Sequence, residues 1–174
     1  MNTANKLTMV RVVLIPVFLV VLYLGFVGSA YIAMLIFIIA SLTDLADGYI
    51  ARSRQQVTNF GKFMDPLADK VLVFAAMLWF VERGSLSAWI VLIVVVREFA
   101  VTALRLIAVD TGRVIAAAKS GKVKTATTML CLIVMFLGLP AWGELICAAL
   151  IVGTTVFSGI EYFIKNGDVL KGAK

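Results

Sequence analysis

Four aspartates stand in two close pairs in the first half of the chain, and their spacing suits chemistry. Asp44 and Asp47 are three residues apart, so they would share one face of a helix. Asp65 and Asp69 are four apart, which places them on one face in the same way. Because the chain contains no histidine, the commonest general base is missing and acid–base chemistry must rest on carboxylates.

Carboxylates that lie near one another repel unless they are protonated or bridged by cations. Oxygen ligands without histidine or cysteine nearby predict magnesium or manganese, with two ions bound. Gly48, Ala51 and Gly61 flank the pairs and leave room for a ligand, although close helix packing would also explain them. Arg52 follows Gly48 by one helical turn; it could bind a diphosphate bidentately or serve as a cytoplasmic anchor.

The elements that must position these residues are apolar. The chain has 174 residues, of which 62% are hydrophobic and 15% charged, and its mean hydropathy is +1.04. So little polar surface cannot coat a soluble globule, whereas about 20 residues suffice for each membrane crossing. We predict an all-α membrane protein with one domain, residues 1–174, in which a short N-terminal juxtamembrane segment precedes six transmembrane helices. Their approximate ranges are 9–25, 30–52, 61–82, 86–110, 121–139 and 143–165.

Lysine and arginine alternate between the successive connections. They gather before the first segment, between the second and third, between the fourth and fifth, and after the sixth. The positive-inside rule therefore places both termini in the cytoplasm. The net charge of +6 suits membrane lipids with anionic headgroups and phosphorylated substrates. Basic residues scattered over membrane-proximal loops argue against a nucleic-acid partner. Cys131 and Cys147 lie in apolar runs and are predicted to be packing residues without a disulfide.

The second and third segments are joined by a short loop, so they are predicted to form an antiparallel hairpin that brings the two aspartate pairs together. The third and fourth segments must take charged residues into the membrane, because their uninterrupted apolar runs, 71–81 and 89–96, are too short to cross alone. An ionisable group at membrane depth costs about 3 kcal/mol even on the lenient insertion scale, and usually marks function.

Basic residues of the fourth and fifth segments could bind a phosphate. Arg97 and Arg105 are eight residues apart, about 80° of helical rotation, and could face one cavity. Lys122 and Lys124 begin the fifth segment, where helix N-terminal amides also favour an anion. The two lysines could instead be topological anchors. Arg97 could pair with Glu98, but adjacent helical residues point in different directions, so we expect that pairing to be poor.

The aspartates and their neighbours resemble the signature of the CDP-alcohol phosphotransferase family. The matching pattern is Asp44-x2-Asp47-Gly48-x2-Ala51-Arg52-x8-Gly61-x3-Asp65-x3-Asp69. The resemblance implies six transmembrane helices in a homodimer, two metal ions held by Asp44, Asp47, Asp65 and Asp69, and Asp69 as general base. It also implies that an alcohol attacks a CDP-linked donor and that CMP leaves.

The matching positions imply that the donor, CDP-diacylglycerol, contacts Asn5, Thr8, Gly48, Arg52, Thr58 and Gly61. Beyond the signature, the chain most resembles the bacterial phosphatidylglycerophosphate synthase branch of the family. That resemblance implies glycerol 3-phosphate as acceptor, with its phosphate held by Arg97, Arg105, Lys122 and Lys124, and a site facing the cytoplasm at the bacterial cytoplasmic membrane. Thr128 departs from the branch, many members of which carry glutamine there.

Other functions remain open at this point. The acceptor of a related phosphotransferase could be phosphatidylglycerol, inositol phosphate or serine. A cation-coupled transporter could use Asp69 and Lys70 as a proton-coupled site, although the chain lacks the paired discontinuous segments typical of inverted-repeat transporters. A non-catalytic membrane scaffold could also retain the motif.

Overall fold

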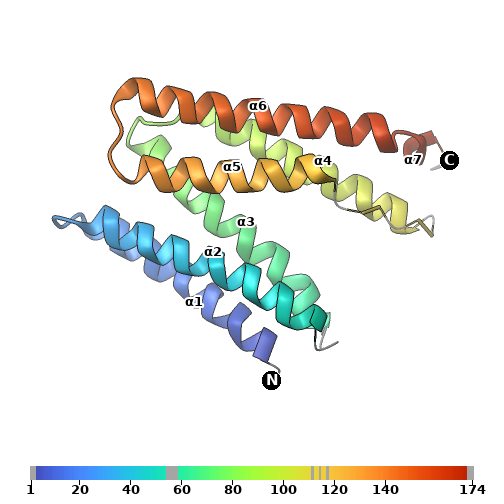
Figure 1. The fold of residues 1–174 in the computed structure, drawn as a ribbon, viewed down its shortest axis with the longest axis horizontal. Helices are drawn as coiled ribbons and strands as arrows, with labels where there is room; N and C mark the ends of the chain where they lie inside the picture. Colours follow the sequence, from blue (N-terminus) through green and yellow to red (C-terminus); the bar gives the residue numbers. More distant parts are fainter. Residues whose placement is uncertain (1–2, 54–58, 111, 114, 117, 172–174) are drawn as a thin grey trace. The chain divides into compact units, whose positions relative to one another are not determined.

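The computed structural model describes the backbone of residues 3–53, 59–110, 112–113, 115–116 and 118–171 (Figure 1). Side chains are described over the same ranges except 3–8, 44–53, 59–66, 69 and 170–171. Every regular element within these ranges is a helix. The helices are α1 (Thr3–Leu24), α2 (Ser29–Ser53), α3 (Asn59–Glu82), α4 (Ala88–Asp110), α5 (Lys119–Met135), α6 (Ala141–Asn166) and α7 (Asp168–Lys171).

The all-α prediction is confirmed, and the helices α1 to α6 correspond to the six predicted segments. Two boundaries differ by more than two residues: α1 already begins at Thr3, so most of the expected juxtamembrane segment belongs to this helix, and α5 ends at Met135 instead of residue 139. The short α7 was not predicted. With only four residues, it contains too few turns to show a periodic pattern in the sequence.

Glycines end two of the helices in the left-handed conformation, which costs glycine little. Gly84 after α3 and Gly112 after α4 both have φ of 76°. The amide that follows each glycine donates to a carbonyl five residues earlier, Ser85 to Phe80 and Arg113 to Ala108. These Schellman-type ends turn the chain back sharply and set the limits of both helices.

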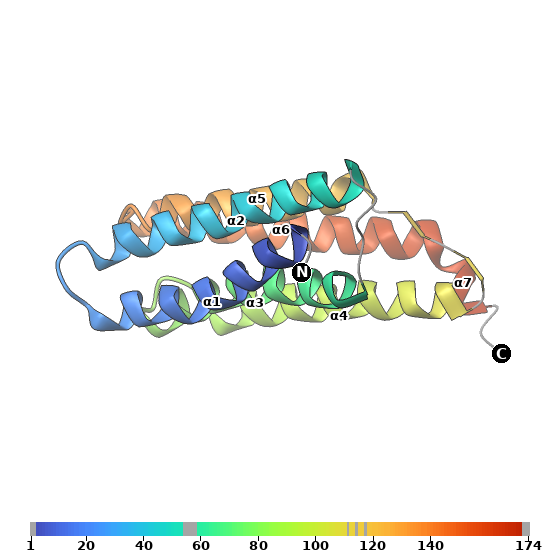
Figure 2. The same ribbon diagram turned by 90° about the horizontal axis from the view of Figure 1, so that it is seen from below.

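The described chain divides into two compact units. Unit 1 comprises residues 1–79 and 136–138, and unit 2 comprises residues 80–135 and 139–174. In unit 1, α1 and α2 run side by side as an antiparallel pair (Figures 1 and 2). The buried face of α1 carries Arg11, Ile15, Phe18 and Leu22, spaced by three or four residues. Phe18 meets Phe37 of α2 and Phe136, with ring centroids 6.0 Å apart in each pair.

In unit 2, α6 packs along both α4 and α5. The buried face of α4 carries Val91, Val94, Val101, Leu104 and Ala108. The faces of α5 and α6 mix apolar with polar side chains: Lys124, Thr128, Thr155 and Ser158 are all buried. These four buried side chains form a polar strip inside the otherwise apolar packing of unit 2. Cys131 and Cys147 are buried and free, as predicted.

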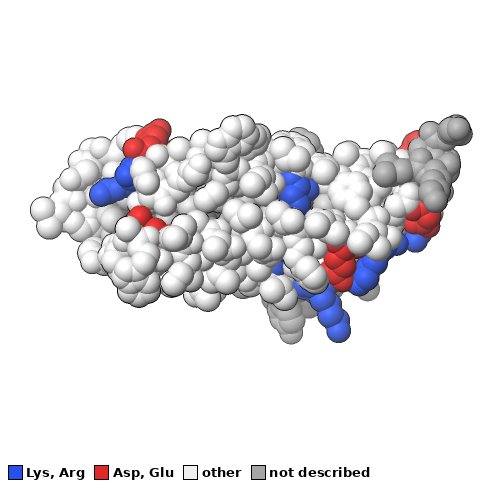
Figure 3. Space-filling model, turned by 90° about the horizontal axis from the view of Figure 1, so that it is seen from above, with Lys and Arg blue, Asp and Glu red and all other residues white. Residues whose placement is uncertain are grey.

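Within the described residues, α6 is the one helix long and apolar enough to cross a membrane. Shorter apolar stretches cover Met9–Leu24 and Ser29–Thr43. Large apolar side chains such as Val20, Trp142 and Ile164 are exposed. In the space-filling view most of the described surface is uncharged (Figure 3). Such a surface suits contact with lipid.

Candidate functional site

The two aspartate pairs lie on consecutive helices. Asp44 and Asp47 belong to the C-terminal part of α2, and Asp65 and Asp69 to the N-terminal half of α3. The helical spacing predicted for each pair is therefore present. The four side chains lie outside the described residues, as does the connection 54–58, so their convergence and metal binding stay predictions.

The residues expected to contact the donor, Asn5, Thr8, Gly48, Arg52, Thr58 and Gly61, also lie outside the described residues or side chains. Among the side chains that are described, no group of three or more His, Cys, Asp or Glu could hold a metal ion.

Arg11 supplies a cation inside unit 1. Its side chain is fully buried, and Nε donates to the carbonyl oxygen of Ala40 at 3.3 Å. Thr43 Oγ1 donates to the same oxygen at 2.7 Å. Ala40 precedes Asp44 by four residues, one helical turn. The packing of α1 against α2 thus encloses a basic residue of the N-terminal part of the chain.

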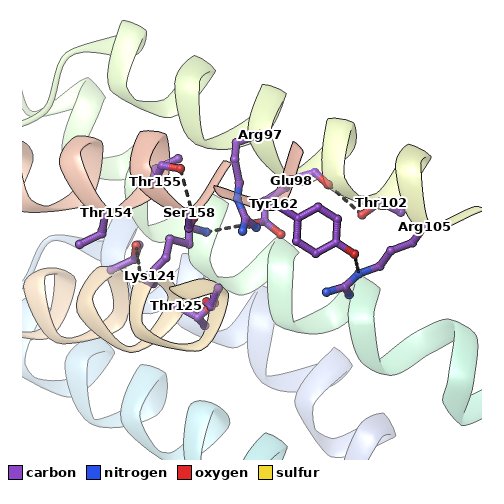
Figure 4. Close-up of polar contacts among 12 residues, drawn as sticks. Arg97, Glu98, Thr102, Arg105, Lys124, Thr125, Thr154, Thr155, Ser158 and Tyr162 are labelled. Atoms are coloured by element: carbon purple, nitrogen blue, oxygen red, sulfur yellow. Dashed lines mark hydrogen bonds and ion pairs between the residues drawn. The ribbon is translucent and has the colours of Figure 1, made fainter. Parts of the chain in front are cut away.

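Three charged side chains meet in the polar strip of unit 2 (Figure 4). Glu98 Oε1 accepts a hydrogen bond from Arg97 Nη1 at 2.9 Å and another from Lys124 Nζ at 2.8 Å. The side chains of Arg97, Glu98 and Lys124 are only 12%, 15% and 6% exposed. Two cations share one carboxylate oxygen, so this cluster carries a net charge of about +1, and we call it the Glu98 cluster.

The expectation that Arg97 and Glu98 pair poorly is wrong. Neighbouring positions on a helix diverge by about 100°, but the long arginine side chain can bend back far enough for its guanidinium to reach the adjacent carboxylate. Lys124 reaches the same oxygen from α5. Helix spacing alone did not indicate this three-way contact, because it depends on how α4 and α5 are arranged.

Two glycines leave the space that Arg97 occupies. A Cβ atom at Gly159 of α6 would lie 3.2 Å from Arg97 Cγ, and one at Gly121 of α5 would lie 3.5 Å from Nη2. Arg97 Nε is buried and has no hydrogen-bond partner. A buried donor left unsatisfied costs about 1–3 kcal/mol, so it is a position where an anionic ligand would be favoured.

Arg105 has a separate partner. Its Nε donates to the hydroxyl of Tyr162 at 2.8 Å, and its guanidinium carbon lies 5.3 Å from the centroid of the same ring. Tyr162 is 2% exposed and packs with Val101 and Leu104 in a buried cluster. Arg97 and Arg105 are separated by about 12 Å along the axis of α4. Arg97 and Arg105 are therefore held by different partners. A ligand that contacted both arginines would have to span two turns of α4.

The two lysines of α5 differ. Lys124 is buried in the Glu98 cluster, whereas Lys122 is exposed. Lys124 is thus held by a specific ion pair, and the exposure of Lys122 fits the alternative of a topological anchor as well as ligand binding. Thr128, the departure from the branch pattern, is also buried and donates to the carbonyl oxygen of Lys124 at 2.9 Å.

A cavity of about 520 Å³ lies beside Tyr162, lined by residues of the α4–α5 connection, α5 and α6. Its basic lining residues are Arg113, Lys119 and Lys165, of which Arg113 pairs with Asp168 and Lys165 with Glu161. The hydrogen bond from Arg113 lowers the pKa of the exposed Asp168 carboxyl. The cavity as a whole favours an anionic ligand.

Sequence reasoning named Glu98 as an alternative partner of Arg97 but expected the pairing to be poor, and it missed Tyr162 as the partner of Arg105. The sequence signal for a role of Glu98 is its type, since it is an acidic residue within an apolar run. Tyr162 is 57 residues away from Arg105 in the chain, so no local pattern connects the two.

Comparisons with known proteins identify the family to which the paired aspartates pointed. Residues 1–158 match the family of CDP-alcohol phosphatidyltransferases, and the chain belongs to this family. A relative from Bacillus subtilis (strain 168), CDP-diacylglycerol–glycerol-3-phosphate 3-phosphatidyltransferase, is 44% identical across 98% of this chain and 97% of its own. Relatives of the same name are 39% identical in Salmonella typhimurium, across 97% of both chains, and 37% in Pseudomonas fluorescens, across 93% and 88%.

Proposed function

We propose that this protein transfers the phosphatidyl group of CDP-diacylglycerol to glycerol 3-phosphate, forming phosphatidylglycerophosphate and CMP. The observation that carries the proposal is the similarity to the B. subtilis enzyme named for these substrates, which extends over 98% of this chain. The buried cations of unit 2 support it, since they suit an acceptor that carries a phosphate.

The donor would be bound in unit 1. The four aspartates fit magnesium or manganese because they offer only carboxylate oxygens and the chain has no histidine. Bound there, two such ions would supply neutralisation of the charge that grows on the phosphate oxygens. Arg52 would bind the diphosphate, and Asn5, Thr8, Gly48, Thr58 and Gly61 would border the donor.

The acceptor hydroxyl would lose its proton to Asp69. Its oxygen would form a bond to the phosphorus nearer the lipid, while the bond from that phosphorus to the oxygen bridging to CMP breaks, so CMP leaves with the electron pair. Arg97 and Lys124 would hold the acceptor phosphate, and Arg105 and Lys122 would add charge. The basic cavity beside Tyr162 would attract the phosphorylated acceptor from the cytoplasm.

The membrane arrangement belongs to the same proposal. All six long helices would cross the cytoplasmic membrane of a bacterial cell, with both termini and the site facing the cytoplasm, and two copies would form a homodimer. The bacterial source of the relatives, the exposed apolar side chains and the alternation of basic residues between connections support this arrangement.

A CMP-release assay with an acceptor panel tests the proposal. Purified protein in detergent with CDP-diacylglycerol and magnesium should release CMP on addition of glycerol 3-phosphate, but at most weakly with phosphatidylglycerol, inositol phosphate, serine or glycerol. Chelation of the divalent ions should abolish release and magnesium should restore it, while Asp69→Asn should lower the rate by about 100-fold or more, as loss of a general base does. Release with another acceptor and none with glycerol 3-phosphate would refute the proposed acceptor.

A further inference from the structure

Glu98 lies where the two cations of the Glu98 cluster converge. Its Oε1 atom accepts from Arg97 of its own helix and from Lys124 of α5, at 2.9 and 2.8 Å. Without this carboxylate two like charges would face each other where little water reaches them, and they would move apart. One carboxylate oxygen therefore keeps a guanidinium and an ammonium group side by side.

The carboxylate also selects which edge of the guanidinium it uses. Glu98 takes Nη1 of Arg97, while Arg97 Nε is left buried without a partner. Gly159 of α6 allows Arg97 to pack closely, since a Cβ there would lie 3.2 Å from Arg97 Cγ, and Gly121 of α5 lies beside Nη2 of the same side chain. A buried guanidinium whose Nε–H has no partner can donate to one more anionic oxygen.

We propose that Glu98 is a positioning residue for the acceptor phosphate: it holds Arg97 Nη1 and Lys124 Nζ in place and leaves Arg97 Nε to bind the phosphate. The inference rests on the proposed function and extends it to a residue that does not itself contact substrate. A carboxylate beside a phosphate also repels it, so the two effects of Glu98 oppose each other and are separable by experiment. Positioning predicts that removal of the charge weakens acceptor binding, whereas repulsion predicts that it strengthens binding.

The test compares the KM for glycerol 3-phosphate with the KM for CDP-diacylglycerol, both measured on the purified full-length protein in the presence of magnesium. Glu98→Gln keeps the shape of the side chain but removes its charge. We expect the KM for glycerol 3-phosphate to rise by about 10- to 100-fold, since hydrogen bonds to charged groups are involved. The KM for CDP-diacylglycerol should stay within about twofold, a split that general loss of structure would not produce.

Two further variants keep the result interpretable. Glu144→Gln is the matched control, because it makes the same change in the first turn of α6, outside the Glu98 cluster and the cavity beside Tyr162, and should leave both KM values unchanged. Glu98→Asp retains the buried charge and so preserves the fold if Glu98→Gln does not, but its shorter side chain cannot reach both cations. It should raise the KM for glycerol 3-phosphate with a Tm close to that of the wild type.

Three results would overturn the inference: a lower KM for glycerol 3-phosphate in Glu98→Gln, an unchanged KM in both Glu98 variants, or an equal rise in both KM values. Each requires an active wild-type protein. A wild-type protein that releases no CMP with glycerol 3-phosphate would instead refute the proposed function, so the two failures are distinguishable.

Discussion

Tyr162 orients Arg105 in two ways at once. Its hydroxyl accepts the Nε–H of the guanidinium, and its ring lies close enough for a cation–π contact. Because Tyr162 is itself almost fully buried among apolar side chains, it cannot follow movements of the exposed arginine. The buried Tyr162 therefore restrains the Arg105 guanidinium, so less conformational entropy would be lost if Arg105 bound a ligand.

Tyr162→Phe should separate the hydrogen bond from the packing. The phenylalanine ring keeps the core contacts and the cation–π contact, so the Tm should change little. Loss of one hydrogen bond of about 0.5–1.5 kcal/mol should raise the KM for glycerol 3-phosphate by about 2- to 10-fold. Steady-state kinetics with Tyr31→Phe, an exposed tyrosine of α2, provide the control. An acceptor KM equal to that of the wild type would show that Arg105 needs no support from Tyr162.

At the scale of the element, α6 carries glycines with different surroundings. A Cβ at Gly159 would meet Arg97 Cγ at 3.2 Å, whereas one at Gly153 would meet nothing within 4 Å. Both lie inside the helix, where glycine is about 0.5–1 kcal/mol less favourable than alanine. At Gly159 the missing side chain leaves space for Arg97, whereas Gly153 has no neighbouring side chain to accommodate.

Alanine at these two glycines should therefore have opposite consequences. Gly153→Ala should leave the acceptor KM unchanged and raise the Tm slightly, since it gains about 0.5–1 kcal/mol of helix propensity without a clash. Gly159→Ala should push Arg97 from its position and raise the KM for glycerol 3-phosphate by about threefold or more, because misplacement of a binding group weakens its contacts. Kinetics and thermal melts of the two variants together check this; identical behaviour would mean that the space at Gly159 does not constrain Arg97.

For the whole molecule, the proposed six crossings require helices that carry charged residues to enter the membrane. Among the described residues, α6 alone is long and apolar enough to cross, whereas α4 and α5 carry charged residues. In unit 2 those charges are partly neutralised by pairing, since Glu98 contacts two cations in the described structure. Paired charges cost less at membrane depth than isolated ones, so a hydropathy average underestimates the ability of such helices to cross.

Cysteine labelling should reveal the proposed topology. In a background of Cys131→Ala and Cys147→Ala, a membrane-impermeant maleimide should label Val27→Cys in intact cells, because Val27 is fully exposed in the α1–α2 connection. Ala116→Cys, exposed in the α4–α5 connection, should react only after the cells are permeabilised. Labelling of both sites in intact cells, or the reverse pattern, would contradict cytoplasmic termini with six crossings.

The sequence by itself determined the features that depend on local pattern. Apolar runs and glycine breaks predicted α1 to α6 within a few residues, because helix formation and termination are local events. The spacing of the four aspartates indicated shared helical faces and the family, which the match over residues 1–158 confirmed. Their convergence on metal ions remains a prediction.

Only the tertiary structure decided how the cations of unit 2 are supported. Lys124 is 26 residues from Glu98 and Tyr162 is 57 residues from Arg105, so each contact exists because particular helices pack together. The position of Arg97 between Gly121 and Gly159 depends on three helices at once. Periodicity identifies which face of a helix is apolar. The partner of a buried charge depends on which helix packs beside it, and no local stretch of sequence determines that packing.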